Sequence, residues 1–321
     1  MISPAVNGYI LRRLVAMVPV LFFVSIVTFG VTLLLPGDPA LAYIGETNIN
    51  DRQMYQAVRA ELGLDEPVPV QYLKWLGRVV QGDFGRSIRT REPAVEGLLA
   101  RLPVTVELSV LAMAIAFTIA LPIGILSAVR PNSKLDLGGT LVGMIGIAIP
   151  DFWLAILLIY VMAVWLRVLP SSGFEPLQQG LLPNLQSMVL PSLALGMGLA
   201  AVLMRQLRSA LIEVLQHEYV LVARAKGLQP SIVLRRHALK NALLPVVTII
   251  GLQVGRLLGG AVLIETIFAL PGLGRLATDS ILFRDYPMLE GVVFILALAV
   301  LVSSLATDIA YAALDPRIRY G

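Results

Sequence analysis

The sequence predicts an all-α polytopic membrane protein with six transmembrane helices and a small extramembrane insertion between the first two. Hydrophobic residues make up 57% of the 321 residues and charged residues only 14%, whereas soluble domains hold about 25% charged residues. The mean hydropathy is +0.81. The apolar residues form runs of about 20, the length that crosses the hydrocarbon core of a bilayer.

The first predicted span is Leu14 to Leu35, with Arg12 and Arg13 in front of it. A charged flank, an apolar run and the sequence Ala40-Leu41-Ala42 also fit a secretory signal with a cleavage site. The run is too long for the apolar part of a signal, so a transmembrane helix is favoured.

Residues 37–101 form the predicted insertion, in which residues 52–62 and 70–80 have helical patterns. A segment of this size buries only a small core and is marginal by itself. We therefore expect it to pack against the membrane domain.

Five further spans are predicted. The apolar segment Leu137 to Leu166 is too long for one straight crossing, and we expect a break at Pro150, either as a kink or as an interfacial lead-in before a span. The other four spans are residues 104–129, 185–207, 242–264 and 289–312. The predicted division is an N-terminus with the first helix (1–36), the insertion (37–101), a transmembrane core (102–312) that contains a loop at 209–241, and a tail (313–321).

The arginines and lysines of the short loops set the orientation. With the N-terminus inside, the cytoplasmic side collects Arg12, Arg13, Arg130, Lys134, Arg205, Arg208, Arg224, Lys226, Arg235, Arg236, Lys240, Arg317 and Arg319. The short outer loops hold only Arg167, Arg275 and Arg284. Both termini and the loop 209–241 are therefore predicted to be cytoplasmic.

The stretch Glu218 to Pro245 is polar and basic and lies between two apolar runs. Residues 218–226 are compatible with a helix, and Gly227 predicts its end because glycine adopts a positive φ without strain. A second polar helix is expected over residues 231–240. A short basic helix–turn–helix indicates a surface for a partner; the alternative is a basic face that contacts anionic lipid.

Two motifs in this stretch carry a resemblance. The first comprises Tyr219, Ala223, Arg224, Ala225, Lys226, Gly227 and Leu228, and the second comprises Arg236, His237, Ala238, Leu239, Asn241, Ala242, Leu243 and Pro245. The stretch resembles the cytoplasmic EAA coupling loop of ABC importer permeases, in the version of the dipeptide/oligopeptide branch. Leu221, Val222 and Lys240 depart from the general family motif and are typical of this branch.

Further motifs extend the resemblance over nearly the whole chain. The segments 36–39, 62–65, 71–72 and 82–85 resemble the periplasmic segment of these permeases. The segments 271–275 and 284–287 resemble their outer loop, and residues 315–320 resemble their C-terminal signature.

The resemblance implies a type I ABC importer permease in a bacterial inner membrane. It implies a second homologous permease, two ATPase subunits that bind ATP and Mg, and an extracytoplasmic binding protein that delivers a di- or oligopeptide. Nickel, glutathione and oligosaccharide importers share this architecture and stay open as alternatives. The implied ATPase-coupling residues are Glu218, Tyr219, Ala223, Arg224, Ala225, Lys226, Gly227, Arg236 and His237. Their helix sits in a groove of the ATPase in this family, and Ala223 and Ala225 are small enough for close approach.

Two charged residues inside the predicted spans are candidates for the translocation pathway, because a charge at membrane depth is costly unless it is paired or hydrated. Asp151 lies at the expected break, and Arg256 lies midway along the fifth span. A helix cap or a structural ion pair is the alternative for each. If both line the pathway, they offer opposite charges to the termini of a zwitterionic peptide. Glu107, Glu265 and Asp308 lie near span ends, where they can reach headgroups.

Three glycines of the fifth span, Gly251, Gly255 and Gly259, recur on one helix face. This spacing allows close approach of helices. Packing against the sixth helix or a partner permease is favoured over a pathway lining.

The sequence contains no catalytic or cofactor motif. The chain has two histidines and no cysteine, which excludes disulfides and thiolate chemistry. It has no phosphate-binding G-x-x-x-x-G-K-[ST] loop, and no basic arm with aromatics that indicates nucleic acid. A secondary transporter or channel fits the composition. It does not need a basic cytoplasmic helix–turn–helix, however, and the sequence shows no inverted repeat.

Overall fold

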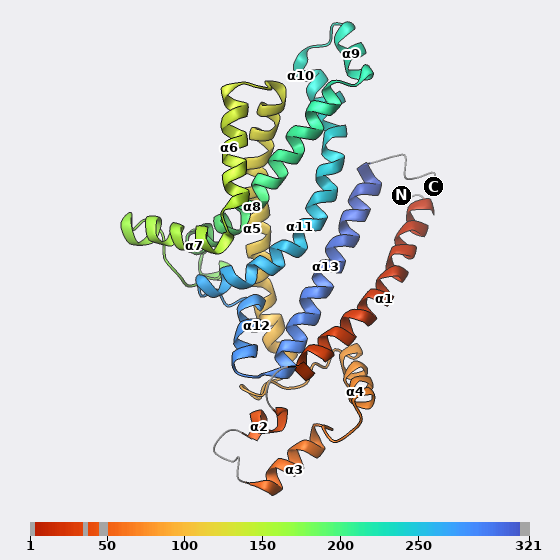
Figure 1. The fold of residues 1–321 in the computed structure, drawn as a ribbon, viewed down its shortest axis with the longest axis vertical. Coiled ribbons are helices and arrows are strands. Elements are labelled where there is room, and N and C mark those ends of the chain that lie inside the picture. Colours follow the sequence, from red (N-terminus) through yellow and green to blue (C-terminus); the bar gives the residue numbers. More distant parts are fainter. Residues whose placement is uncertain (1–3, 35–37, 45–50, 315–321) are drawn as a thin grey trace. The chain divides into compact units, whose positions relative to one another are not determined.

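A computed structural model describes residues 4–34, 38–44 and 51–314 (Figure 1). The helices are α1 (Pro4–Leu34), α2 (Pro39–Ile44), α3 (Arg52–Glu61), α4 (Val68–Val80), α5 (Ala94–Val129), α6 (Lys134–Ala148), α7 (Asp151–Leu158), α8 (Leu181–Leu215), α9 (Glu218–Ala225), α10 (Pro230–Ile232), α11 (Leu239–Ile267), α12 (Leu273–Leu282) and α13 (Tyr286–Leu314). The predicted C-terminal signature at 315–320 lies outside the described residues.

Five described helices are long and apolar enough to cross a membrane. They are Arg12–Leu34, Ala94–Val129, Leu181–Leu215, Pro230–Ile267 and Tyr286–Ile309. A bent pair, α6 with the helical run Asp151–Trp165, adds a sixth when its halves are counted as one span. This agrees with the six predicted spans.

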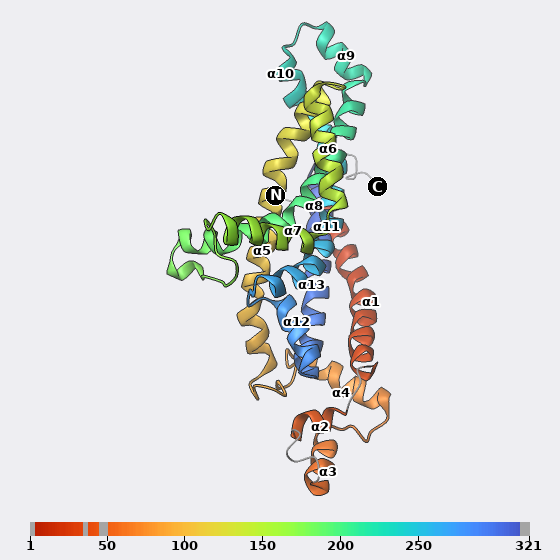
Figure 2. The same ribbon diagram turned by 60° about the vertical axis from the view of Figure 1, so that its left-hand side comes forward.

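The bend at Pro150 follows from backbone chemistry. Ile149 ends α6 in an extended conformation with ψ 122°, because the residue before a proline is disfavoured in the helical region. Pro150 then occupies the N-cap position of α7, and the two halves meet at 102°. Figure 2 shows α7 running across the direction of α6. The predicted break is confirmed.

The chain forms two compact units, and the first comprises residues 1–11, 106–270 and 302–321. Its central helix is α8, which contacts α6, α7 and α11. Of the most apolar 18-residue stretch of α8, 78% is buried. Small residues allow this close packing: a Cβ on Gly196 would lie 2.6 Å from the carbonyl oxygen of Ala112 on α5.

The second unit comprises residues 12–105 and 271–301, so the insertion shares it with the segment that leads into α13. The start of α5 lies in its apolar cluster, where Ala94 and Leu98 pack with Leu273, Met288 and Val292. This burial explains why α5 begins at residue 94, well before the predicted start of the span at residue 104.

Within the insertion, Arg59 joins two of the acidic motif residues. Its Nη1 lies 3.0 Å from Asp38 Oδ2 and its Nη2 lies 2.8 Å from Asp65 Oδ1. Burial raises the pKa of Asp38, but hydrogen bonds from Tyr55 and the Ala40 N–H, together with the charge of Arg59, outweigh burial and leave the pKa below its ordinary 3.8. Asp38 and Asp65, from two of the motif segments, therefore belong to one polar network.

The outer motifs at 82–85 and 284–287 also belong to one arrangement. Asp285 is buried and accepts hydrogen bonds from the Ser87 hydroxyl and from the Ile88 N–H at 3.0 Å. The Arg89 guanidinium lies 3.8 Å from the centre of the Phe283 ring. Asp285 therefore fastens the loop before α5 to the start of α13.

Replacing Asp285 by alanine is expected to release this loop. A hydrogen bond to a charged group contributes about 1.5–3 kcal/mol, so trypsin should cleave the purified protein at Arg86 or Arg89 at least about tenfold faster. Asp83, whose Oδ1 accepts only from the nearby Gly85 N–H among the hydrogen bonds described, provides the control. Equal cleavage rates in the Asp285→Ala and Asp83→Ala proteins would contradict this role of Asp285.

Candidate functional site: a helical loop and a polar pocket

The loop after α8 forms a short helix and a sharp turn. In both views α9 and α10 lie at one end of the helices of the first unit (Figures 1 and 2). The helix α9 ends at Ala225, and Gly227 follows with φ +78°. Its N–H donates to the carbonyl oxygen of Arg224 at 2.9 Å. Helices commonly end in this way, with a glycine in the left-handed region just after the last turn. The predicted stop at Gly227 is confirmed.

The second polar helix, expected over residues 231–240, is not a separate element. Helix α10 starts at Pro230, a favoured first position because proline has no N–H to leave unpaired there. A π-helical stretch, Val233–Ala238, then joins it to α11. One helical run, Pro230–Ile267, therefore extends from the loop into the span.

A small hydrogen-bonded cluster, which we name the Tyr219 clip, fastens α9 to the start of α11. The Asn241 amide donates to the Tyr219 hydroxyl at 2.7 Å and to the carbonyl oxygen of His237 at 3.2 Å. The His217 ring stacks on Tyr219 with centroids 5.8 Å apart. Asn241 is part of the sequence motif but is missing from the predicted coupling residues, because its role depends on a contact between two helices.

The predicted coupling residues divide by exposure. Exposed members are Glu218, Tyr219, Arg224, Ala225, Lys226, Gly227 and Arg236, while His237 is half-buried. Ala223 is only 6% exposed and lies on the inner side of α9 with the fully buried Val220. The structure therefore places the Ala223 side chain against the chain itself, and Ala225 is the small residue left on the surface.

Arg208, which the sequence groups with the basic cytoplasmic residues, is bound inside the chain. Its Nε and Nη2 donate to Asp136 Oδ1 and Oδ2 at 2.5 and 2.7 Å. Asp136 is 3% exposed and also accepts from the Asn132 N–H at 2.8 Å. The pair joins α6 to α8. The sequence analysis missed Asp136; its signal is a lone carboxylate in the first turn of an otherwise apolar helix.

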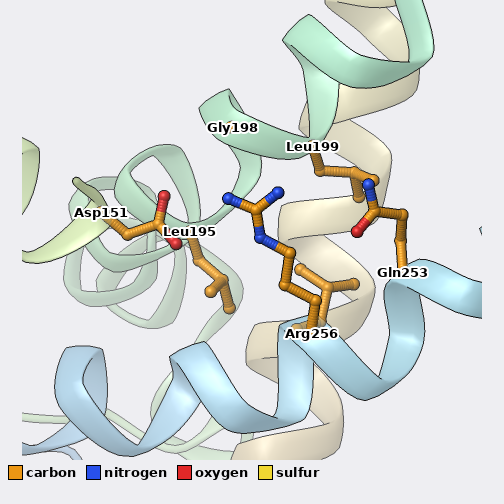
Figure 3. Close-up of a pocket in the computed structure, with 7 residues that line it drawn as sticks. Asp151, Leu195, Gly198, Leu199, Gln253 and Arg256 are labelled. Carbon is orange, nitrogen blue, oxygen red and sulfur yellow. The ribbon is translucent and has the colours of Figure 1, made fainter. Parts of the chain in front are cut away.

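The two pathway candidates lie in one pocket (Figure 3). Asp151 extends from the first turn of α7, and Arg256 and Gln253 extend from α11; Figure 3 shows the carboxylate and the guanidinium facing each other. The apolar wall consists of Leu195, Leu199 and Leu257. Asp151 does not occupy the N-cap of α7, which is Pro150, so the cap alternative is wrong.

Two glycines make room for the Asp151 carboxylate. A Cβ on Gly198 of α8 would lie 3.0 Å from Asp151 Oδ1 and 3.9 Å from Arg256 Nη2. A Cβ on Gly260 of α11 would lie 3.6 Å from Asp151 Oδ2 and 2.9 Å from the Leu195 side chain. Neither glycine was predicted as part of the site, because spacing along one helix does not show which side chain approaches from another.

The three predicted packing glycines have different surroundings. A Cβ on Gly251 would lie 2.5 Å from the Thr307 side chain of α13, so this glycine allows the fifth and sixth spans to touch. Gly255 is half-buried and Gly259 is exposed. A Cβ on Gly259 would meet no atom within 4 Å among the described residues.

Two further carboxylates, Glu107 and Glu265, lie near the predicted span ends. Glu107 accepts from the Asn184 amide at 2.7 Å. Glu265 is fully buried, so the expectation that it reaches the headgroups is wrong. Within the described ranges, no three His, Asp or Glu side chains gather as candidate metal ligands.

Two protein families match the chain. Residues 120–320 match the family described as "Binding-protein-dependent transport system inner membrane component". Residues 6–109 match "Binding-prot-dependent transport system membrane comp, N-term".

Curated relatives match over almost their whole length. The oligopeptide transport system permease protein AppB of Bacillus subtilis (strain 168) is 43% identical over 320 residues, which cover 98% of this chain and 99% of the relative. The di/tripeptide transport system permease protein DppB of Pseudomonas aeruginosa (strain UCBPP-PA14) is 40% identical with the same coverage. The glutathione transport system permease protein GsiC of Salmonella paratyphi A (strain ATCC 9150 / SARB42) is also 40% identical, covering 98% and 99%.

A solved structure shares the fold. The MetNI methionine ABC transporter in an inward-facing conformation gives a TM-score of 0.56 at 22% identity, covering 68% of this chain and 96% of that chain. At this identity the similarity concerns the fold alone.

Proposed function

The chain belongs to the binding-protein-dependent transport system inner membrane components, and on this premise we propose that it is the permease subunit of an ATP-driven importer for di- and oligopeptides. The observation that carries the proposal is the similarity, over almost the full length, to permeases named for oligopeptides and di/tripeptides. The chain is a multi-pass inner membrane protein, and other subunits of the complex hydrolyse ATP.

The proposed complex contains a second homologous permease, two ATPases that bind ATP and Mg, and an extracytoplasmic binding protein. The family name supports the binding protein. The excess of arginine and lysine in the loops on one side supports an orientation with the loop 209–241 and both termini in the cytoplasm.

We assign ATPase docking to the exposed end of α9. Arg224 and Lys226 are exposed there and can form charge-assisted hydrogen bonds with carboxylates of an ATPase groove. Ala225 keeps the last turn small enough for close approach. The Tyr219 clip and the Gly227 turn hold α9 in place, so a displaced ATPase moves α9 together with the ends of α8 and α11.

The ion pair between Asp136 and Arg208 extends this connection to α6. Because α9 follows α8 after a two-residue turn, and because the ion pair fixes α6 to α8, the helices α6, α8 and α9 move together. Asp151 follows the break that ends α6, so movement of the loop reaches the polar pocket. The passage then opens alternately to the two sides as the ATPases close and separate.

ATP hydrolysis by the assembled complex tests the proposal. The chain would be reconstituted in lipid with its genomic-neighbour permease, ATPases and binding protein, and peptides of varied length would be compared with glutathione, nickel and oligosaccharides. We expect stimulation by peptides. Stimulation by nickel or a sugar alone would overturn the substrate while keeping the architecture, and failure of any ATPase to assemble would overturn the role of α9. Glutathione is a specific second candidate because of the 40% identical relative.

A further inference from the structure

The polar pocket of Figure 3 has the composition of a binding site for a zwitterion. One acidic, one basic and one amide side chain, Asp151, Arg256 and Gln253, face a space with an apolar wall. The acidic group comes from α7, whereas the other two come from α11. The site is therefore assembled from elements that the break at Pro150 brings together.

The two charges lie close together in the pocket. Asp151 Oδ1 and Arg256 Nη2 lie 3.0 and 3.9 Å from the same point, the position of a Cβ on Gly198. Arg256 is exposed and Asp151 is half-buried, so the two opposite charges attract each other with partial screening by their surroundings. Pairing also lowers the cost of keeping each charge within a spanning segment.

Two glycines lie beside the Asp151 carboxylate in the wall of the site. Gly198 and Gly260 leave the space that a side chain would fill, next to Asp151 Oδ1 and Oδ2 respectively. The carboxylate is thus accommodated by two helices that offer it no side chain at these positions.

We propose that this pocket binds the charged termini of a short zwitterionic peptide during its passage, with the peptide ammonium at Asp151 and the peptide carboxylate at Arg256. The Gln253 amide is placed to donate to, or accept from, the peptide bond between them. This inference rests on the proposed function and names the chemistry that the passage recognises.

Such binding is an exchange of partners that leaves the site neutral. The ammonium replaces the guanidinium beside Asp151, and the substrate carboxylate replaces Asp151 beside Arg256. A substrate with one blocked terminus leaves one side-chain charge without a partner, which is costly for a charge within a spanning segment. The site therefore discriminates against capped peptides.

The distance between the termini limits the length of the substrate that satisfies both groups. An extended chain spans at most about 3.3–3.6 Å per residue, so only a very short peptide has its two termini close enough for one pocket. Longer peptides engage one charge at a time. We therefore expect the site to favour dipeptides.

A thiol-protection experiment tests the assignment, because the chain has no cysteine of its own. A Gln253→Cys permease, assembled with its partner permease and ATPases in lipid, is labelled with a water-soluble thiol reagent. Dialanine, N-acetyl-dialanine and dialanine amide are added in turn, without the binding protein, so that its selectivity does not interfere. The measured quantity is the ligand concentration that halves the labelling rate.

Dialanine is expected to protect at a concentration at least about tenfold lower than either capped form, a difference of about 1.4 kcal/mol. Added to this background, Asp151→Asn should remove the discrimination against the N-acetyl form and keep that against the amide. Arg256→Gln should do the reverse. Leu252→Cys, at a neighbouring residue of α11 that is 76% exposed and outside the pocket lining, should not be protected by any of them.

The proposal is supported if each variant removes the discrimination at one peptide terminus and keeps it at the other. A purely structural ion pair would not distinguish the two termini. Equal loss of protection for all three ligands in both variants would overturn it in favour of a structural pair. Glu107→Gln, which alters another carboxylate of the spans, should leave the discrimination intact. Failure of the proposed function is recognised separately, as absence of peptide-stimulated ATP hydrolysis in the parent complex.

Discussion

A Gly227→Leu permease is expected to insert into the membrane normally and to lose peptide uptake at least about tenfold. At Gly227 φ is +78°, and a Cβ there would meet no described atom within 4 Å. The effect therefore comes from the backbone and not from a clash. An L-residue in the left-handed region is disfavoured by about 1–2 kcal/mol, and relief of this strain reorients α9. The measurements are ATPase capture by the purified permease and peptide uptake by the reconstituted complex.

Two variants separate conformation from size. Gly227→Asn should keep most of the uptake, since asparagine tolerates a positive φ. Gly82→Leu should leave ATPase capture unchanged, although Gly82 has a similar φ of +81° and equally open surroundings, because it lies in the insertion. If Gly227→Leu captures the ATPase and imports peptide like the parent, then the turn after α9 is not required for coupling.

Among the variants considered, those that break the ion pair between Asp136 and Arg208 are expected to lose the most stability. Removal of one partner of a buried pair costs about 3–5 kcal/mol, because the other charge is left uncompensated. The Asp136 side chain is 5% exposed, whereas that of Arg208 is 29% exposed and can turn toward water. Arg208→Ala should therefore destabilise the protein more than Asp136→Ala. Thermal unfolding in detergent measures both.

A double variant shows whether the loss of stability in Arg208→Ala comes from leaving the buried Asp136 carboxylate unpaired. Arg208→Ala combined with Asp136→Ala should recover part of the stability lost in Arg208→Ala, because no unpaired charge remains. Uptake per ATP hydrolysed should stay low in the double variant, since α6 is no longer fastened to α8. Arg205→Ala, an exposed arginine one turn earlier on α8, is the control and should change neither. A greater loss of stability in Asp136→Ala than in Arg208→Ala would refute the argument from exposure.

Local features of the fold could be predicted from the sequence because each has a local cause. The break at Pro150 and the stop at Gly227 follow from the backbone chemistry of the residues named. The spans follow from the length of apolar runs. The ends of α5 and α8 could not be predicted from the apolar pattern. In α5, burial of Ala94 and Leu98 against a distant segment extends the helix beyond its apolar run.

The candidate site was only half predictable for the same reason. Asp151 and Arg256 could be found because charges are rare in apolar runs. Their meeting in one pocket, and the roles of Gly198 and Gly260, depend on how three helices cross. Asn241 likewise gains its role from Tyr219 on another helix. Periodicity along a single helix carries no information about such crossings.

The second unit is made of two segments that are far apart in the sequence. This separation determines the order in which the unit can fold during synthesis. Its contacts join residues far apart in the chain: the Ser87 hydroxyl donates to Asp285, and the Leu273 N–H donates to the Thr105 hydroxyl. At about 5–20 residues per second, the ribosome needs on the order of ten seconds or more to travel between such partners. During this interval the small core of α2 and α3 can form from local residues. The start of α5 waits, with its apolar face open, until α12 and the beginning of α13 have left the ribosome.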